Sequence, residues 1–413
     1  DLFVKGMPIS EFGSLAPPAA VKSSTMAFEA ARVLERNSFR PLLITFPDGA
    51  KAGVLDKDRL LMVQNYSPAV FLREIAMASS PGDVQKLSRR LAELVRILVL
   101  NGVKAFNVNH FITQSADAVL ERLISFALEK LGKAPAPFVF LVMGSEGRFE
   151  QTLKTDQDNA ILYQDVPAEE RAAADEYFGG LGRLVCGWLE EAGYSSCAGG
   201  IMAKNPKWCQ PMSVWKNYFA EWITKAGSEE LLKTKIFFDF RGAWGEIGFA
   251  DELRASLREN LESTPGFFFL LARDVLRFEP PIGLFGNFTH DGSKGSEIDI
   301  KAVMTFIVDF ARIYALRSAL SETNTPDRLA ALQEKGVLKE ASYDEMAQAY
   351  SYLMHLRLLN QVRKYADTGA ADNGVDPYSL TSIDQKMLKE IFAQIKHFQV
   401  RLSYDFTGMS ERL

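Results

Sequence analysis

Two acids separated by one residue, Asp156 and Asp158, could together bind a metal ion. They begin an apolar run that predicts a strand, on which side chains two positions apart share a face, roughly 6 to 7 Å from each other. Upstream, Gly144 and Ser145 follow residues 138–143, an apolar run typical of a strand covered on both faces. Glycine lets a ligand approach the backbone closely, and the amide and hydroxyl of Ser145 can donate to phosphate oxygens. The pattern predicts metal-assisted transfer of a nucleotidyl or phosphoryl group.

A third acid is expected from a second apolar segment. Residues 235–240 predict a strand, and Asp239 inside this run is costly unless it is paired, hydrogen-bonded or bound to metal. We therefore expect Asp239 to complete the metal site with Asp156 and Asp158, and to help deprotonate an acceptor hydroxyl. Three neighbouring acids repel one another unless a cation lies between them, and Mg²⁺ prefers oxygen ligands. These residues predict a two-ion Mg²⁺ site.

Basic residues near these segments are candidates for binding phosphates. Arg148 and Lys154 lie between the Gly-Ser turn and the acid pair, and Arg241 follows the third acid. The helix predicted over residues 299–320 carries two more basic residues in a polar stripe beside its apolar face, for which a solvated surface is the alternative explanation. The predicted nucleotide-binding residues are Gly144, Ser145, Arg148, Lys154, Arg241, Lys301 and Arg312.

Composition limits the class of protein. With 413 residues, 47% hydrophobic and 24% charged, the chain is expected to form a soluble protein of two to four domains. A net charge of -5 argues against a general nucleic-acid binder. Neither a membrane span nor a signal peptide is expected. The three cysteines form no CxxC pair, so disulfides and structural zinc are not expected and a reducing cytoplasm fits best.

The N-terminal region follows a small α/β pattern that resembles one cystathionine-β-synthase-type (CBS) motif, with Asp48 and Gly49 at its turn. Asp56 and Arg59 stand where such motifs often hold a nucleotide with Thr and Asp, so ligand binding is not expected. The alternative to ligand binding is that this segment is a structural remnant or a dimerisation surface. A dimerisation surface predicts a homodimer through this segment. The predicted elements are a helix at 26–36, strands at 41–46 and 52–55, and a helix at 57–63.

The rest of the chain is predicted from apolar spacing and from breaks at Gly and Pro. Helices are expected both before and after the acid pair, and an aromatic stripe within 212–225 is interpreted as core. Scattered histidines are treated as structural. Helices are predicted at 84–98, 117–131, 168–192, 212–225, 299–320, 343–365 and 382–406, with a Pro- and Gly-rich loop at 278–295.

Residues 144–162, GSEGRFEQTLKTDQDNAIL, resemble a nucleotidyltransferase family that commonly lies downstream of cyclic-nucleotide-binding and CBS domains. That family is related to the N-terminal domain of PII-protein uridylyltransferase and lies in the polymerase-β-like superfamily. The resemblance covers about residues 65–410, including a helical C-terminal module that binds substrate. Further similar segments are 67–68, 71–75, 205–208, 237–241, 299–301, 311–317 and 324–329.

The resemblance implies an α+β protein: a polymerase-β-like mixed sheet followed by an all-α bundle, and preceded by a partial CBS-like segment and a helical connector. The predicted boundaries are 1–63, 64–133, 134–250 and 251–413. It implies Mg²⁺ and an NTP donor but does not fix the acceptor. We expect transfer of NMP to a hydroxyl, with a PII-like regulatory protein as a candidate acceptor. A nucleotide sensor without turnover is the alternative, and modification of a small molecule is a third.

Overall fold

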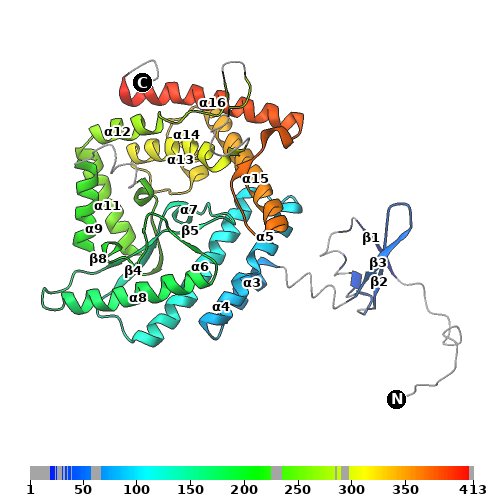
Figure 1. Cartoon of the computed structure of the whole chain (residues 1–413), viewed down its shortest axis with the longest axis horizontal. Helices are drawn as coiled ribbons and strands as arrows, with labels where there is room; N and C mark the ends of the chain where they lie inside the picture. Colours follow the sequence, from blue (N-terminus) through cyan, green and yellow to red (C-terminus); the bar gives the residue numbers. More distant parts are fainter. Residues whose placement is uncertain are drawn as a thin grey trace. The chain divides into compact units, whose positions relative to one another are not determined.

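The computed structural model describes residues 19–23, 25, 30, 33–34, 36–38, 40–56, 67–224, 235–283, 286–289 and 297–408. The chain divides into two compact units, residues 1–74 and 75–413, which are described separately. Figure 1 traces the chain from the small sheet of the first unit, in blue, to the last helix of the second, in red.

The first unit contains a three-stranded sheet. Strand β1 (Ala20–Lys22) pairs in parallel with β2 (Leu42–Thr45), which pairs antiparallel with β3 (Lys51–Leu55). The β2–β3 turn contains Gly49 at φ +84°, a conformation that favours glycine. Both strands and the turn agree with the prediction. The helix predicted at 57–63, Arg59 and most of the helix predicted at 26–36 lie outside the described residues, and the CBS likeness and the homodimer stay predictions.

The second unit is built on a four-stranded mixed sheet of order β8-β6-β4-β9. The central strand β4 (Phe138–Val142) pairs antiparallel with β6 (Asn159–Tyr163) and with β9 (Arg241–Gly245), while β6 pairs in parallel with β8 (Cys209–Pro211). All side chains of β4 and β6 are buried, as continuous apolar runs predict. This confirms the mixed sheet. A separate parallel pair joins β5 (Asp156–Gln157) to β7 (Ser195–Ser196).

Two pairs of helices cover this sheet. Helices α6 and α8 pack on each other and on the sheet, and α9 and α11 form a second pair that also contacts its strands (Figure 1). Trp208, Trp215 and Phe237 form an aromatic cluster with neighbouring rings, which supports the core interpretation of the stripe. Helix α3 (Pro68–Ala76) spans the boundary between the two units. The helices that follow it in this half are α4 (Pro81–Ser88), α5 (Leu91–Leu100), α6 (Ala105–Leu131), α7 (Gly144–Gly147), α8 (Arg171–Glu191), α9 (Met212–Thr224) and α11 (Gly248–Ser263).

The C-terminal half is helical, as predicted. Helix α13 contacts α12, α14, α15 and α16, so its apolar face forms the centre of the bundle (Figure 1, yellow to red). The N-cap of α13 is Asp299, whose side chain accepts a hydrogen bond from the amide of Ala302. The elements are α12 (Gly266–Val275), α13 (Ile300–Arg317), α14 (Thr325–Glu334), α15 (Glu340–Thr368), α16 (Ser382–Thr407) and the short antiparallel pair β10 (Ile298–Asp299) and β11 (Gly374–Val375).

The strand predicted at 235–240 is wrong. Lys235–Phe238 forms a 3₁₀ turn, and the neighbouring strand β9 begins only at Arg241. A strand would place Phe237 and Phe238 on opposite faces, whereas the turn buries both in one aromatic core. Periodicity alone does not distinguish these structures in so short an apolar run.

Two other elements differ from their predictions. The helix predicted at 84–98 is divided into α4 and α5 by a turn at Arg89 and Arg90. The strand predicted to start at Asp156 is interrupted at Asp158, which separates β5 from β6. The interruption lets the two short segments join different sheets, and it places Asp158 at the junction between them.

Candidate active site

The Gly-Ser turn lies at the end of the central strand, against the acid pair. The antiparallel register aligns Val142 with Asn159, and the amide of Met143 donates to the carbonyl oxygen of Asp158 over 2.8 Å. Gly144 has φ +59°, and a Cβ there would lie 2.9 Å from side-chain carbons of Ile236 and 3.2 Å from Asp158 Oδ2. Only glycine fits this turn without displacing its neighbours.

The structure brings Asp156, Asp158 and Ser145 to one cavity of about 390 Å³, as predicted. Asp158 is 6% exposed, and its Oδ1 atom has no hydrogen-bond partner among the residues that the structure describes. Burial, and secondly the charge of Asp156, raise the pKa of Asp158 to about 7. A buried carboxylate oxygen without a donor, beside a second acid, is the arrangement expected of a site that a cation completes.

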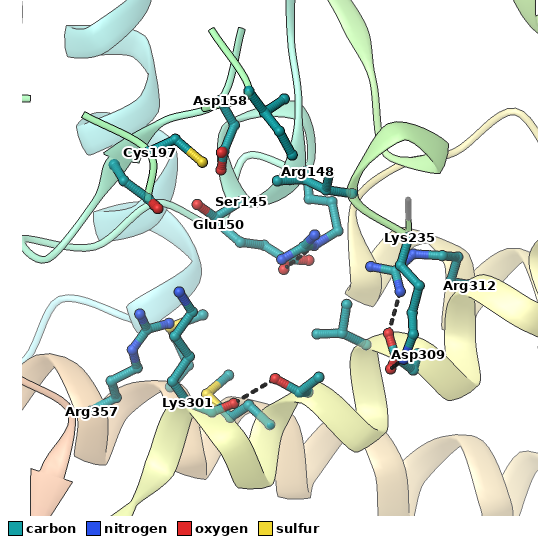
Figure 2. Close-up of a pocket in the computed structure, with 18 residues that line it drawn as sticks. Ser145, Arg148, Glu150, Asp158, Cys197, Lys235, Lys301, Asp309, Arg312 and Arg357 are labelled. Atoms are coloured by element: carbon teal, nitrogen blue, oxygen red, sulfur yellow. Dashed lines mark hydrogen bonds and ion pairs between the residues drawn. The ribbon is translucent and has the colours of Figure 1, made fainter. Parts of the chain in front are cut away.

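A thiol shares this corner of the cavity. One ligand atom each from Asp156, Asp158 and Cys197 lie within 4.8 Å of one another. Cys197 directly follows β7, which pairs in register with β5, so the next position along each strand holds Cys197 and Asp158. Figure 2 shows the sulfur of Cys197 beside the carboxylate of Asp158. Sequence reasoning missed this cysteine because its partner acids lie about 40 positions earlier in the chain.

Basic side chains lie across the cavity from the acids. Figure 2 shows Lys301 of α13 and Arg357 of α15 on the side opposite Asp158. Lys301 is exposed to the cavity, as predicted, and has no ion-pair partner among the residues that the structure describes. Arg357 is only 6% exposed, and its Nε donates to Asn373 Oδ1 over 2.8 Å. Burial lowers the pKa of Arg357 to about 10.

Sequence reasoning did not select Arg357. The available signal was weak: an arginine inside the predicted helix 343–365, flanked by leucines, is expected to be buried with a specific partner. In the described part of the chain no carboxylate lies within ion-pair distance of it. A buried cation that lines a cavity and lacks an ion-pair partner favours an anionic ligand.

The structure corrects the role expected for Asp239. Its side chain is fully buried and does not line the cavity. Its carboxylate is bound by Arg148 Nη1 at 2.6 Å, by Arg328 Nη1 at 2.7 Å and by the guanidinium of Arg312. Burial favours the neutral acid, but the three positive charges outweigh it and hold the pKa of Asp239 well below its usual range. Asp239 therefore satisfies its buried charge with arginines, and the structure does not bring it to Asp156 and Asp158 as the third metal ligand that the sequence predicts.

Arg148 and Arg312 have a double role as a result. Both line the cavity, as expected of phosphate-binding residues. Both also bind Asp239, and Arg148 Nε donates to Glu150 over 2.7 Å while Arg312 pairs with Asp309. Their charges are largely balanced inside the protein, so their main contribution is to hold the walls of the cavity in place.

Two further predictions of nucleotide-binding residues are not supported. Arg241 does not line the cavity: its Nη2 pairs with Asp117 at 2.7 Å and its Nε donates to the carbonyl oxygen of Glu146 over 3.2 Å. It therefore fixes the turn that follows β4. Lys154 is exposed and also does not line the cavity. Lys154 was predicted at the site only because it lies between the Gly-Ser turn and the acid pair in the sequence. In the structure its loop places it outside the cavity lining.

The Gly-Ser turn after β4 and the two acids of the β5–β6 segment line one cavity, and basic residues of α13 and α15 line its opposite side, as the resemblance to nucleotidyltransferases implies. Comparison with known families agrees. Residues 89–229 match the family described as "Putative nucleotidyltransferase DUF294", and residues 265–406 match the "Putative nucleotidyltransferase substrate binding domain". The chain contains both domains. No curated protein matches it.

The two matched domains meet at the cavity. Asp156, Asp158 and Cys197 belong to the first matched segment, whereas Lys301 and Arg357 belong to the second. Asp239 lies between the segments and links to the second through Arg312 and Arg328. Among the described helices, none is both long and apolar enough to cross a membrane.

Proposed function

We propose that the protein is a Mg²⁺-dependent nucleotidyltransferase that moves NMP from an NTP to a hydroxyl group. The observation that carries this proposal is the unpartnered Oδ1 of Asp158, next to Asp156 and opposite Lys301 and Arg357 in one cavity. Acids on one side suit a metal, and unpaired basic groups on the other suit phosphates. We also propose a cytoplasmic location, because all three cysteines are free thiols.

The residues present fit a magnesium ion. Asp156 and Asp158 would hold it, since two carboxylates plus substrate phosphates are a common ligand set for Mg²⁺. When bound, the ion would polarise the phosphoryl oxygens and stabilise the charge that develops on the leaving pyrophosphate. Because Asp239 is held by arginines, the close ligand group at this cavity consists, among the described residues, of these two acids and Cys197, and the two-ion site stays a prediction from the sequence.

The phosphates would be bound from both sides of the cavity. The backbone at Gly144 and the hydroxyl of Ser145 lie beside the acids, where a phosphate bound to the metal would lie. Lys301 and Arg357 would neutralise the far end of the triphosphate. The binding site would thus require both domains, so a nucleotide would be held only where the helical domain closes over the sheet.

Replacing Arg357 with glutamine is expected to weaken NTP binding about 10- to 100-fold. A hydrogen bond to a charged group contributes about 1.5–3 kcal/mol, and 1.4 kcal/mol corresponds to a factor of ten in affinity. Isothermal titration of both proteins with each NTP in Mg²⁺ measures the change. The matched control is Arg363→Gln, which removes an exposed arginine from the same helix outside this cavity. Equal dissociation constants for Arg357→Gln and the control would contradict the assignment.

The acceptor is proposed from the resemblance rather than from a contact. We propose a hydroxyl on a protein such as a PII-like regulator, which the family relationship described above suggests. One observation favours a second candidate, a nucleotide sensor without turnover: three arginines hold the third acid expected of an active enzyme. The two candidates share the nucleotide site and differ in whether pyrophosphate leaves.

The experiment that tests the proposal combines binding and turnover. The purified chain is titrated with each of the four NTPs, with and without Mg²⁺, and the same samples are assayed for pyrophosphate release in the presence of a PII-like protein. We expect Mg²⁺-dependent binding of one NTP and release of pyrophosphate. Binding without release under every acceptor condition would favour the sensor, and no binding would refute both candidates.

A further inference from the structure

We propose that Asp156, Asp158 and Cys197 form a second kind of metal site, which binds a thiolate-preferring divalent cation such as Zn²⁺ and thereby excludes Mg²⁺. The inference rests on the proposed function in one respect, because the same two acids would hold Mg²⁺. It adds a third ligand and an inhibitory state of the enzyme. The transfer reaction itself uses neither the third ligand nor the inhibitory state.

The position of Cys197 is set by the backbone on both sides of it. The parallel pairing of β5 with β7 matches Asp156 to Ser195 and Gln157 to Ser196. Directly afterwards the chain turns, with the amide of Gly200 donating to the carbonyl oxygen of Cys197 over 3.0 Å. The amide of Asn159 then donates to the carbonyl oxygen of Ile201 over 3.2 Å. The loop is thus tied to the acid-bearing segment before and after the cysteine.

The three side chains already lie close to one another. The thiol of Cys197 is half-buried and hydrogen-bonds to Asp158. The potential ligand atoms of the three residues lie within 4.8 Å of one another, so small rotations would bring them around one ion. Independently of the cysteine, Asp158 is more than nine-tenths buried, and no donor from the described part of the chain reaches its Oδ1 atom. A cation bound here would supply the missing partner.

The ligand set distinguishes between cations. Mg²⁺ takes oxygen ligands in near-octahedral geometry, so it has no use for the sulfur. Zn²⁺ and Co²⁺ bind thiolate, imidazole and carboxylate, and Zn²⁺ favours four tetrahedral ligands, of which this site supplies three and water a fourth. On binding, the Cys197 thiol releases its proton to solvent and a sulfur–metal bond forms. Cys197 therefore converts a carboxylate pair that suits Mg²⁺ into a site that binds Zn²⁺ more tightly.

Cobalt is the probe for the sulfur ligand, because a Co²⁺–thiolate bond gives a near-ultraviolet charge-transfer absorption that oxygen ligands do not give. The full chain, freed of metal by chelation, is titrated with Co²⁺. We expect this absorption in the wild type and its displacement by Zn²⁺. Cys197→Ser should lose the absorption. It should also weaken Zn²⁺ binding more than the loss of a residue that only contacts a metal ligand, which typically costs about 10- to 100-fold in affinity. Cys209→Ser, which removes a buried thiol outside the cluster, should keep both.

The outcomes separate this inference from the proposed function. A wild type that binds Mn²⁺ in competition with Mg²⁺, but shows no Co²⁺–thiolate absorption, overturns the cysteine site and leaves the transferase intact. A wild type with the absorption but without turnover supports the site and counts against the transferase. In an active protein, Zn²⁺ should inhibit pyrophosphate release, and Cys197→Ser should raise the inhibitory concentration at least about tenfold. Thermal unfolding followed by circular dichroism identifies a misfolded variant, in which case Cys197→Ala replaces it.

Discussion

Replacing Asp158 with asparagine is expected to stop nucleotidyl transfer and, at the same time, to stabilise the metal-free protein. A bound metal contributes several kcal/mol to the transition state, so pyrophosphate release should fall at least about 100-fold. The fold should gain about 1–3 kcal/mol at pH 8, because the substitution removes a buried negative charge whose pKa is raised to about 7. Denaturant titration without metal measures the gain, and the assay described above measures the loss.

The pH dependence of stability gives this prediction a second readout. The pKa of Asp158 in the folded protein lies above its ordinary value of 3.8. The folded state therefore binds this proton more tightly than the unfolded state does. The resulting contribution to the free energy of unfolding is fully present below pH 3.8 and is lost as the pH rises through about 7. Asp158→Asn should remove this loss. The control Asp344→Asn, at an exposed position outside the cavity, should change neither activity nor the pH profile. Normal turnover in Asp158→Asn would refute the metal site.

The opposite effect on stability is expected for Asp239→Asn, which should destabilise the protein by about 3–5 kcal/mol at pH 7. Removing one member of a buried ionic cluster leaves the others uncompensated, and here Arg148, Arg312 and Arg328 would lose their common partner. Because the pKa of Asp239 is held well below its ordinary value, its stabilising contribution is present at neutral pH and lost in acid. Chemical denaturation measures the effect.

A partly exposed ion pair provides the matched control. Glu93 and Arg96 pair on the surface of α5 at 2.7 Å, and Glu93→Gln should cost less than about 1 kcal/mol. The comparison also tests the alternative that Asp239 binds metal. A metal ligand would behave like Asp158, since its neutralisation in metal-free protein would relieve repulsion and stabilise the fold. An Asp239→Asn variant that is as stable as the wild type, or more so, would contradict the arginine cluster.

The N-terminal half of the active site was predictable because it is local in sequence. The buried strand β4, the Gly-Ser turn and the acid pair all fall between residues 138 and 163, where two apolar runs predict neighbouring strands. The break at Asp158 is not predicted by these runs. The antiparallel pairing of β4 with β6 follows from those runs and brings Gly144 to Asp158. Lys301 was also predictable, since helical spacing separates it from the buried face of α13.

The sequence by itself determined that Asp239, inside an apolar run, needs a partner; only the tertiary structure decided that the partner is a group of arginines and not a metal. Arg312 and Arg328 come from positions more than 70 residues later, and no local pattern records their approach. The same reason explains Cys197 and Arg357, which reach the cavity through a strand pairing and a helix contact distant in sequence. The charge of a buried group can be neutralised by any cation nearby, and which cation is nearby depends on how the helical domain packs on the sheet.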